Sequence, residues 1–119
     1  MTRSFTANSY WITLGHRETT TIGGFTIQYQ GRVSALGSIP PGGIPMQLTV
    51  FGLHPRSLVP TSSYCDPTET IGAIFVPFAD LQQYVDLVRN ERPLRGTLDR
   101  ISGSYLSTGL EPPGEQEGH

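Results

Sequence analysis

The residues with the widest chemical range in this sequence are one cysteine and three histidines. Cys65 and His54 have the types needed for a thiol nucleophile and its base. Together with His16 and Asp66 they also offer sulfur, nitrogen and oxygen ligands of the kind that zinc accepts. No two of them have the short spacing that marks a zinc site or a thiol active site. We therefore expect no metal site, no cofactor and no catalytic role for these residues.

Motifs for phosphate binding and serine catalysis are missing as well. All eight basic residues are arginine, so the lysine-free chain cannot contain a P-loop or an S-x-x-K motif. Neither G-x-S-x-G nor G-x-G-x-x-G occurs. The sequence gives no support for an enzyme, which stays open only as an alternative.

Half of the arginines are concentrated in one short segment near the C-terminus: Arg89, Arg92, Arg95 and Arg100. Guanidinium groups bind phosphate or carboxylate through paired hydrogen bonds, so this cluster is a candidate anion site. Glu91 and Asp99 within this segment and Asp86 just before it offset most of its charge, which favours the simpler interpretation of a solvated surface.

A second candidate ligand site is the proline-rich segment 53–70. Loops longer than about 12–15 residues are uncommon in compact domains and are often functional. The residues in it that could contact a ligand are His54, Arg56, Tyr64, Cys65 and Asp66.

Composition limits the class of protein. The chain has 119 residues and a formal net charge of −2, which fits one domain and makes binding to nucleic acid unfavourable. Trp11 and Phe51 fall opposite the apolar faces of their strands, so a nucleic-acid-binding regulator is kept as a third interpretation. A single cysteine excludes an internal disulfide, and no apolar run is long enough to span a membrane. We expect a cytoplasmic protein with no membrane contact.

Alternating apolar and polar residues predict most of the chain as strands. We predict strands over 9–15, 25–35, 46–53, 71–76, 94–101 and 104–110. The last two form a hairpin around Ser102-Gly103, and Gly31 interrupts the second strand with a bend or bulge. Residues 16–21 are predicted as a polar connection and residues 37–45 as a loop.

One segment has helical periodicity. Apolar residues recur every three or four positions from Phe78 to Val88, which predicts a helix over about 78–91 that ends before Pro93.

The fold class that follows is α+β. We expect a β-rich single domain over residues 1–110, built as a bent antiparallel sheet or a small, partly open barrel of five or six strands. The helix precedes the C-terminal hairpin. Residues 111–119 form an acidic Pro/Gly tail that we expect to be flexible.

The leading functional hypothesis is a non-catalytic binding or interaction module. Only 15% of the residues are charged, and edge strands on such a surface favour a protein partner or self-association as a homo-oligomer. The alternative is a small anionic-ligand-binding protein, or an enzyme, that uses the 53–70 loop and the Arg89–Arg100 cluster.

Overall fold

A computed structural model describes residues 2–40, 43–60, 63–91, 93–99 and 103–108. Eight strands, a short 3₁₀ helix and one α-helix follow one another along the chain: β1 (Thr2–Thr6), β2 (Ser9–Ile22), β3 (Phe25–Ile39), β4 (Ile44–Leu53), β5 (Tyr64–Cys65), β6 (Ile71–Pro77), η1 (Phe78–Asp80), α1 (Leu81–Asn90), β7 (Leu94–Asp99) and β8 (Gly103–Thr108).

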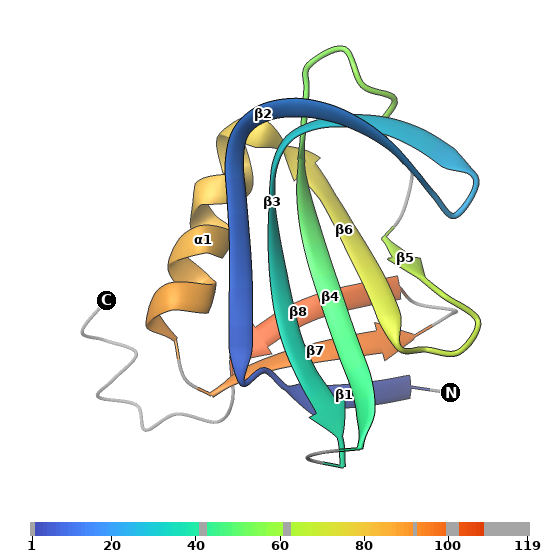
Figure 1. The fold of residues 1–119 in the computed structure, drawn as a ribbon, viewed down its shortest axis with the longest axis vertical. Helices are drawn as coiled ribbons and strands as arrows, with labels where there is room; N and C mark the ends of the chain where they lie inside the picture. The colour runs from blue at the N-terminus through green and yellow to red at the C-terminus, as the bar shows by residue number, and fades with distance from the viewer. Residues whose placement is uncertain (1, 41–42, 61–62, 92, 100–102, 109–119) are drawn as a thin grey trace.

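The strands form two sheets, which confirms the α+β class. The larger has the order β2-β3-β4-β6-β5 and the smaller the order β1-β7-β8 (Figure 1). All pairs are antiparallel except β4–β6, and the larger sheet is strongly bent without closing into a barrel. Two of the strands were not predicted, β1 and the two-residue β5.

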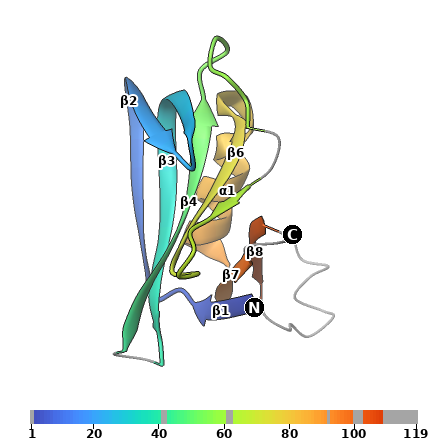
Figure 2. The same cartoon turned by 90° about the vertical axis from the view of Figure 1, so that its right-hand side faces the viewer.

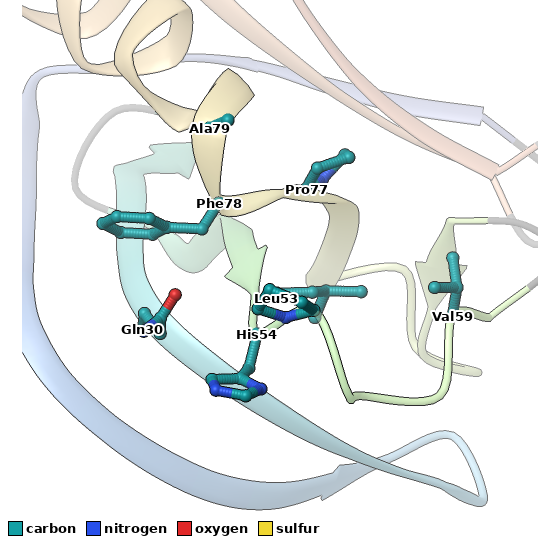
Figure 3. A pocket seen from close by; sticks show the side chains of 8 residues that line it. Gln30, Leu53, His54, Val59, Pro77, Phe78 and Ala79 are labelled. Carbon is teal, nitrogen blue, oxygen red and sulfur yellow. The ribbon is translucent and has the colours of Figure 1, made fainter.

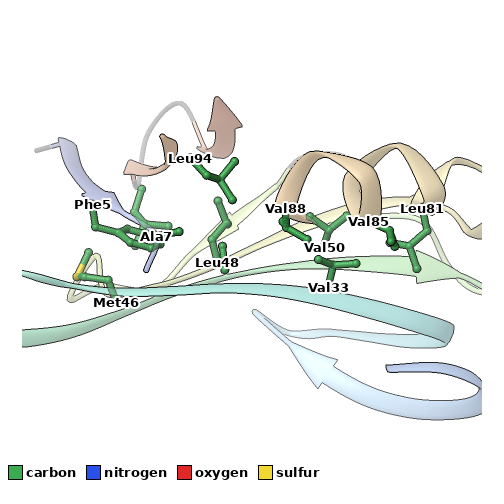
Figure 4. Packing of buried hydrophobic residues seen from close by; sticks show 12 residues of the cluster. Phe5, Ala7, Val33, Met46, Leu48, Val50, Leu81, Val85, Val88 and Leu94 are labelled. Atoms are coloured by element: carbon green, nitrogen blue, oxygen red, sulfur yellow. The ribbon is translucent and has the colours of Figure 1, made fainter. Parts of the chain in front are cut away.

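The helix and the small sheet cover the same face of the large sheet (Figure 2). The main core lies between these layers, where Leu81, Val85 and Val88 of α1 pack on Val33 and Val50 (Figure 4). All of these side chains are buried, so the predicted helical stripe is confirmed. Helix 78–91 is observed as η1 followed by α1, and it ends at Asn90, shortly before Pro93.

A bulge in β3 gives the large sheet a second apolar cluster on its opposite face. Tyr29 is paired with Leu53 and Gly31 with Gly52, so Gln30 is an extra residue in β3. An extra residue moves the following side chains to the other face of the sheet. Val33 therefore packs under the helix, whereas Tyr29 joins the second cluster: Ile27, Tyr29, Phe51, Leu53 and Ala73.

The bend predicted at Gly31 is thus present, and it curls the β2–β3 hairpin over the sheet. Figure 1 shows this hairpin arching across the top of the molecule. Its tip reaches β5 at the opposite edge, where a Cβ added at Gly23 would lie 2.6 Å from Cδ1 of Tyr64.

Two predicted connections are wrong. Residues 16–21 belong to β2, because the β2–β3 pairing resumes at Glu18–Tyr29 after an irregularity that follows Leu14. Most of the predicted loop 37–45 extends the β3–β4 hairpin, in which Ile39 is paired with Ile44. Polar residues, glycine and proline mark connections only on average, and cross-strand pairing makes most of both segments strand.

Two paired glycines provide the surface on which the helix begins. Gly31 and Gly52 face η1, and a Cβ on either would lie about 3 Å from side-chain atoms of Phe78 and Leu81. The first helical turn therefore approaches the backbone of the sheet closely.

No helix in the described part of the chain is long and apolar enough to cross a membrane. The predicted tail 111–119 lies outside the described residues.

Candidate functional site

The first half of β2 combines an open sheet edge with exposed apolar side chains. β2 ends the order of the large sheet, and within the described residues it pairs with β3 alone. Its segment Ser9–Leu14 therefore presents backbone donors and acceptors along one side.

Three large side chains are exposed along this edge: Tyr10, Trp11 and Leu14. Tyr10 and Leu14 point to the helix face, as does the partly buried Ile12, while Trp11 points to the opposite face. Trp11 is 59% exposed and Leu14 52% exposed.

Trp11 is held in place although it is exposed. The guanidinium carbon of Arg32 lies 5.4 Å from the centre of the Trp11 ring and 6.0 Å from that of Tyr29. Cation–π contact of this kind orients an aromatic ring without burying it. Tyr29 in turn donates a hydrogen bond to Glu18 (2.8 Å), and burial together with this bond raises the pKa of its hydroxyl.

The edge segment itself carries no charge. The chain contains no charged residue from Ser4 through Gly15, whereas natural edge strands normally carry charge or proline against unwanted pairing. Arg32 of β3 and the irregularity after Leu14 lie beside the segment. We call Ser9–Leu14 with its three exposed side chains the β2 edge.

Residues 54–60 form an anchored loop beside an apolar cleft. The His54 amide donates to the Gln28 carbonyl and the Gln28 amide donates to Ser57 Oγ, both at 2.9 Å. The cleft, about 480 Å³ in volume, lies where β4 and β6 end (Figure 3). Its lining consists of Gln30, Leu53, His54, Pro55, Val59, Pro77, Phe78 and Ala79.

The structure separates the five candidate residues of segment 53–70 into two groups. His54 follows Leu53, which is paired with Pro77, whereas Cys65 is paired with Gly72. These positions are five residues apart on β6, roughly 16 Å along the strand. His54 and Arg56 therefore lie at one end of β6, and Tyr64, Cys65 and Asp66 at the other.

Asp66 stabilises the turn between β5 and β6 through hydrogen bonds to its carboxylate. Its Oδ1 accepts hydrogen bonds from the amides of Thr70 and Ile71, each at 2.9 Å, and Thr68 donates to its Oδ2. Partial burial opposes ionisation of the carboxyl, but these hydrogen bonds outweigh it and lower the pKa of Asp66 below its ordinary value. Cys65 donates its thiol proton to the Asp66 carbonyl (3.4 Å).

The arginine cluster is only partly described. Arg89 is exposed in the last turn of α1, and Arg95 is exposed on β7 opposite Thr6 and Ser107. Arg92 and Arg100 lie outside the described residues, so the predicted anion site remains a prediction.

Sequence patterns missed several residues of both regions. Gln30, Val59 and Phe78 were not identified as cleft residues, because loop 54–60 and η1 meet only in the folded chain. The uncharged run from Ser4 to Gly15 was the available signal for the β2 edge. Phe51, considered with Trp11 for base stacking, is 5% exposed and belongs to the second cluster.

No protein-family model, curated protein or solved structure matches the chain, so its interpretation rests on the β2 edge and the cleft.

Proposed function

We propose that the protein is a non-catalytic interaction module that self-associates through the β2 edge. The observation that carries this proposal is the uncharged segment Ser9–Leu14, whose outer side has no neighbouring strand among the described residues, with Tyr10, Trp11 and Leu14 exposed on it. Two copies would align their β2 strands antiparallel and join their large sheets into one.

The chemistry of this edge suits a second copy. The edge of an antiparallel strand is self-complementary under a two-fold axis, because each copy offers the same alternation of donors and acceptors. The absence of charge from Ser4 to Gly15 removes the repulsion that like charges would cause at a symmetric contact. Aromatic side chains such as Trp11 and Tyr10 are the types that supply most binding free energy at interfaces.

Light scattering after size-exclusion chromatography tests the proposal. Between about 10 µM and 1 mM protein, the mass of the wild type is expected to rise from one chain to two. Amide hydrogen exchange in Ser9–Leu14 is expected to slow over the same range, since pairing satisfies the open backbone groups.

Trp11→Glu is the discriminating variant. In the monomer the new carboxylate lies beside Arg32, so the variant is expected to fold. In a dimer two such carboxylates would repel each other and raise the dissociation constant by about tenfold or more. The matched control is Tyr105→Glu, which changes an equally exposed aromatic residue (53%) on β8 and should leave the dimer unchanged. A wild type that stays monomeric up to the highest concentration contradicts self-association.

A further inference from the structure

The cleft beside loop 54–60 has walls that suit an apolar molecule. Leu53, Pro55, Val59, Pro77 and Phe78 supply most of the lining, and the volume of about 480 Å³ falls within the range of small-ligand sites. Val59 is 70% exposed, so an apolar surface of this loop is left uncovered in the free chain.

The loop that forms one wall is fixed before any ligand binds. Besides the two bonds to Gln28, the Ser57 amide donates to the His54 carbonyl (2.9 Å), and Ser57 Oγ donates to the Leu58 carbonyl (2.9 Å). A fixed wall reduces the conformational entropy that a ligand would otherwise have to overcome.

His54 gives the cleft one hydrogen-bond donor of defined position. Its Nδ1 accepts the Arg56 amide proton at 3.1 Å, so in the neutral ring the proton is on Nε2. Partial desolvation, then the charges of Arg17 and Arg56, lower the pKa of His54, which favours the neutral ring. Nε2–H is therefore the donor that the His54 ring can offer to a ligand.

The electrostatic surroundings favour an anion. The Arg56 amide donates to the His54 ring, and Arg17 donates to the side chain of Gln28, whose carbonyl accepts from the His54 amide. None of the residues that line the cleft is acidic. Gln30, on the bulge of β3, adds an amide group to the same lining (Figure 3).

From the apolar walls, the Nε2–H donor and the two arginines, we infer that this cleft binds a small apolar monocarboxylate. The hydrocarbon or aromatic body lies against Leu53, Val59 and Phe78, and the carboxylate accepts from His54. This site is independent of the β2 edge, and it assigns the expected anionic ligand to His54 and Arg56 without the distant Tyr64, Cys65 and Asp66.

The test is an NMR titration of the ¹⁵N-labelled protein with 4-phenylbutyrate. Saturable shifts are expected at the amides of Gln30, His54 and Ala79, with a dissociation constant below about 10 mM. The uncharged isostere 4-phenylbutyramide is expected to bind about tenfold more weakly, because it lacks the charge. Absence of saturable shifts, or equal affinity for the two probes, overturns the inference.

Two variants identify the residues that contribute. His54→Leu keeps an apolar wall but removes the donor, and it should weaken 4-phenylbutyrate by about tenfold. Arg56→Gln changes an exposed side chain. It should weaken the binding of 4-phenylbutyrate but not that of 4-phenylbutyramide. Leu58→Ala, on the same loop but outside the lining, is the control and should bind like the wild type.

A measurement on the unmodified protein covers the case in which His54→Leu fails to fold. Nitrogen chemical shifts of the imidazole report which nitrogen carries the proton, and Nε2–H is expected at pH 7. A ring protonated on Nδ1 would remove the donor from the proposed position and overturn the inference.

Discussion

Asp66, which the sequence indicated as a candidate ligand-binding residue, stabilises the turn between β5 and β6. Both of its carboxylate oxygens accept hydrogen bonds from residues 68–71, and its own amide donates to the Ile71 carbonyl (2.9 Å). Asp and Asn close turns in this way whenever the following amides come within reach. The sequence placed Asp66 in the proline-rich segment 53–70, but which groups it bonds depends on the β5–β6 register.

Replacing Asp66 by alanine should therefore destabilise the fold. Loss of the acceptors for the Thr70 and Ile71 amides is expected to lower the free energy of unfolding by about 1–3 kcal/mol. Urea denaturation at pH 7 measures this change. Asp86→Ala is the control, because Asp86 is exposed and accepts one side-chain hydrogen bond from Gln82; its effect should stay within about 0.5 kcal/mol.

The lowered pKa of Asp66 predicts that the stability of the fold depends on pH. Its pKa is lower in the folded protein than its ordinary value of 3.8. Its stabilising contribution is therefore complete above the unfolded pKa and is lost as pH falls through the folded pKa. In Asp66→Asn the decline in stability below about pH 4 should be shallower than in the wild type. Equal slopes would show that the Asp66 carboxylate does not stabilise the fold.

Among the elements, helix α1 was the easiest to predict and strand β3 the most instructive. The helix depends on local periodicity, and its stripe was identified in full. In β3 the odd positions from Ile27 to Ala35 are buried as predicted, yet the bulge at Gln30 divides them between two faces. A bulge is an extra residue in one strand relative to its partner, so the alternation of apolar and polar residues in β3 alone cannot reveal it. That alternation by itself predicts a single buried face.

The packing of α1 on the large sheet predicts that a charge on its buried face will destabilise the fold. Val85 is 4% exposed and lies over Val33 and Val50, so Val85→Asp would bury an unpaired carboxylate in the main core. We expect loss of cooperative thermal unfolding, or a destabilisation of more than about 4 kcal/mol. Gln83→Asp introduces the same group at an exposed position of the same helix, and its thermal transition should remain close to that of the wild type.

At the scale of the whole molecule, the two candidate surfaces follow from how the layers are stacked. The small sheet and α1 cover one face of the large sheet, and the curled β2–β3 hairpin covers part of the other. The β2 edge is left open because the chain places no strand beside it in the described residues. The cleft exists because β4 and β6 end together next to η1. Neither arrangement follows from local patterns, since both depend on pairings between distant segments.

The two sheets approach each other closely at Gly72 of β6. A Cβ there would lie 2.3 Å from Cδ2 of Leu98 and 2.5 Å from Oγ of Ser104. Leu98 is fully buried, and Ser104 Oγ donates to the Tyr64 carbonyl (2.8 Å), so both neighbours are held in place. Gly72→Ala is expected to lower the free energy of unfolding by about 1–3 kcal/mol and to speed hydrogen exchange in β7.

A double-mutant cycle separates this contact from a general effect of alanine in a strand. Leu98→Ala alone leaves a cavity and should cost about 2–5 kcal/mol, but in combination with Gly72→Ala it removes the closest of the contacts with the added methyl group. The two changes should therefore destabilise the protein by less than the sum of their separate effects, with a coupling of about 0.5 kcal/mol or more. Strict additivity would mean that the small sheet does not rest on Gly72, and that another contact sets the separation of the layers.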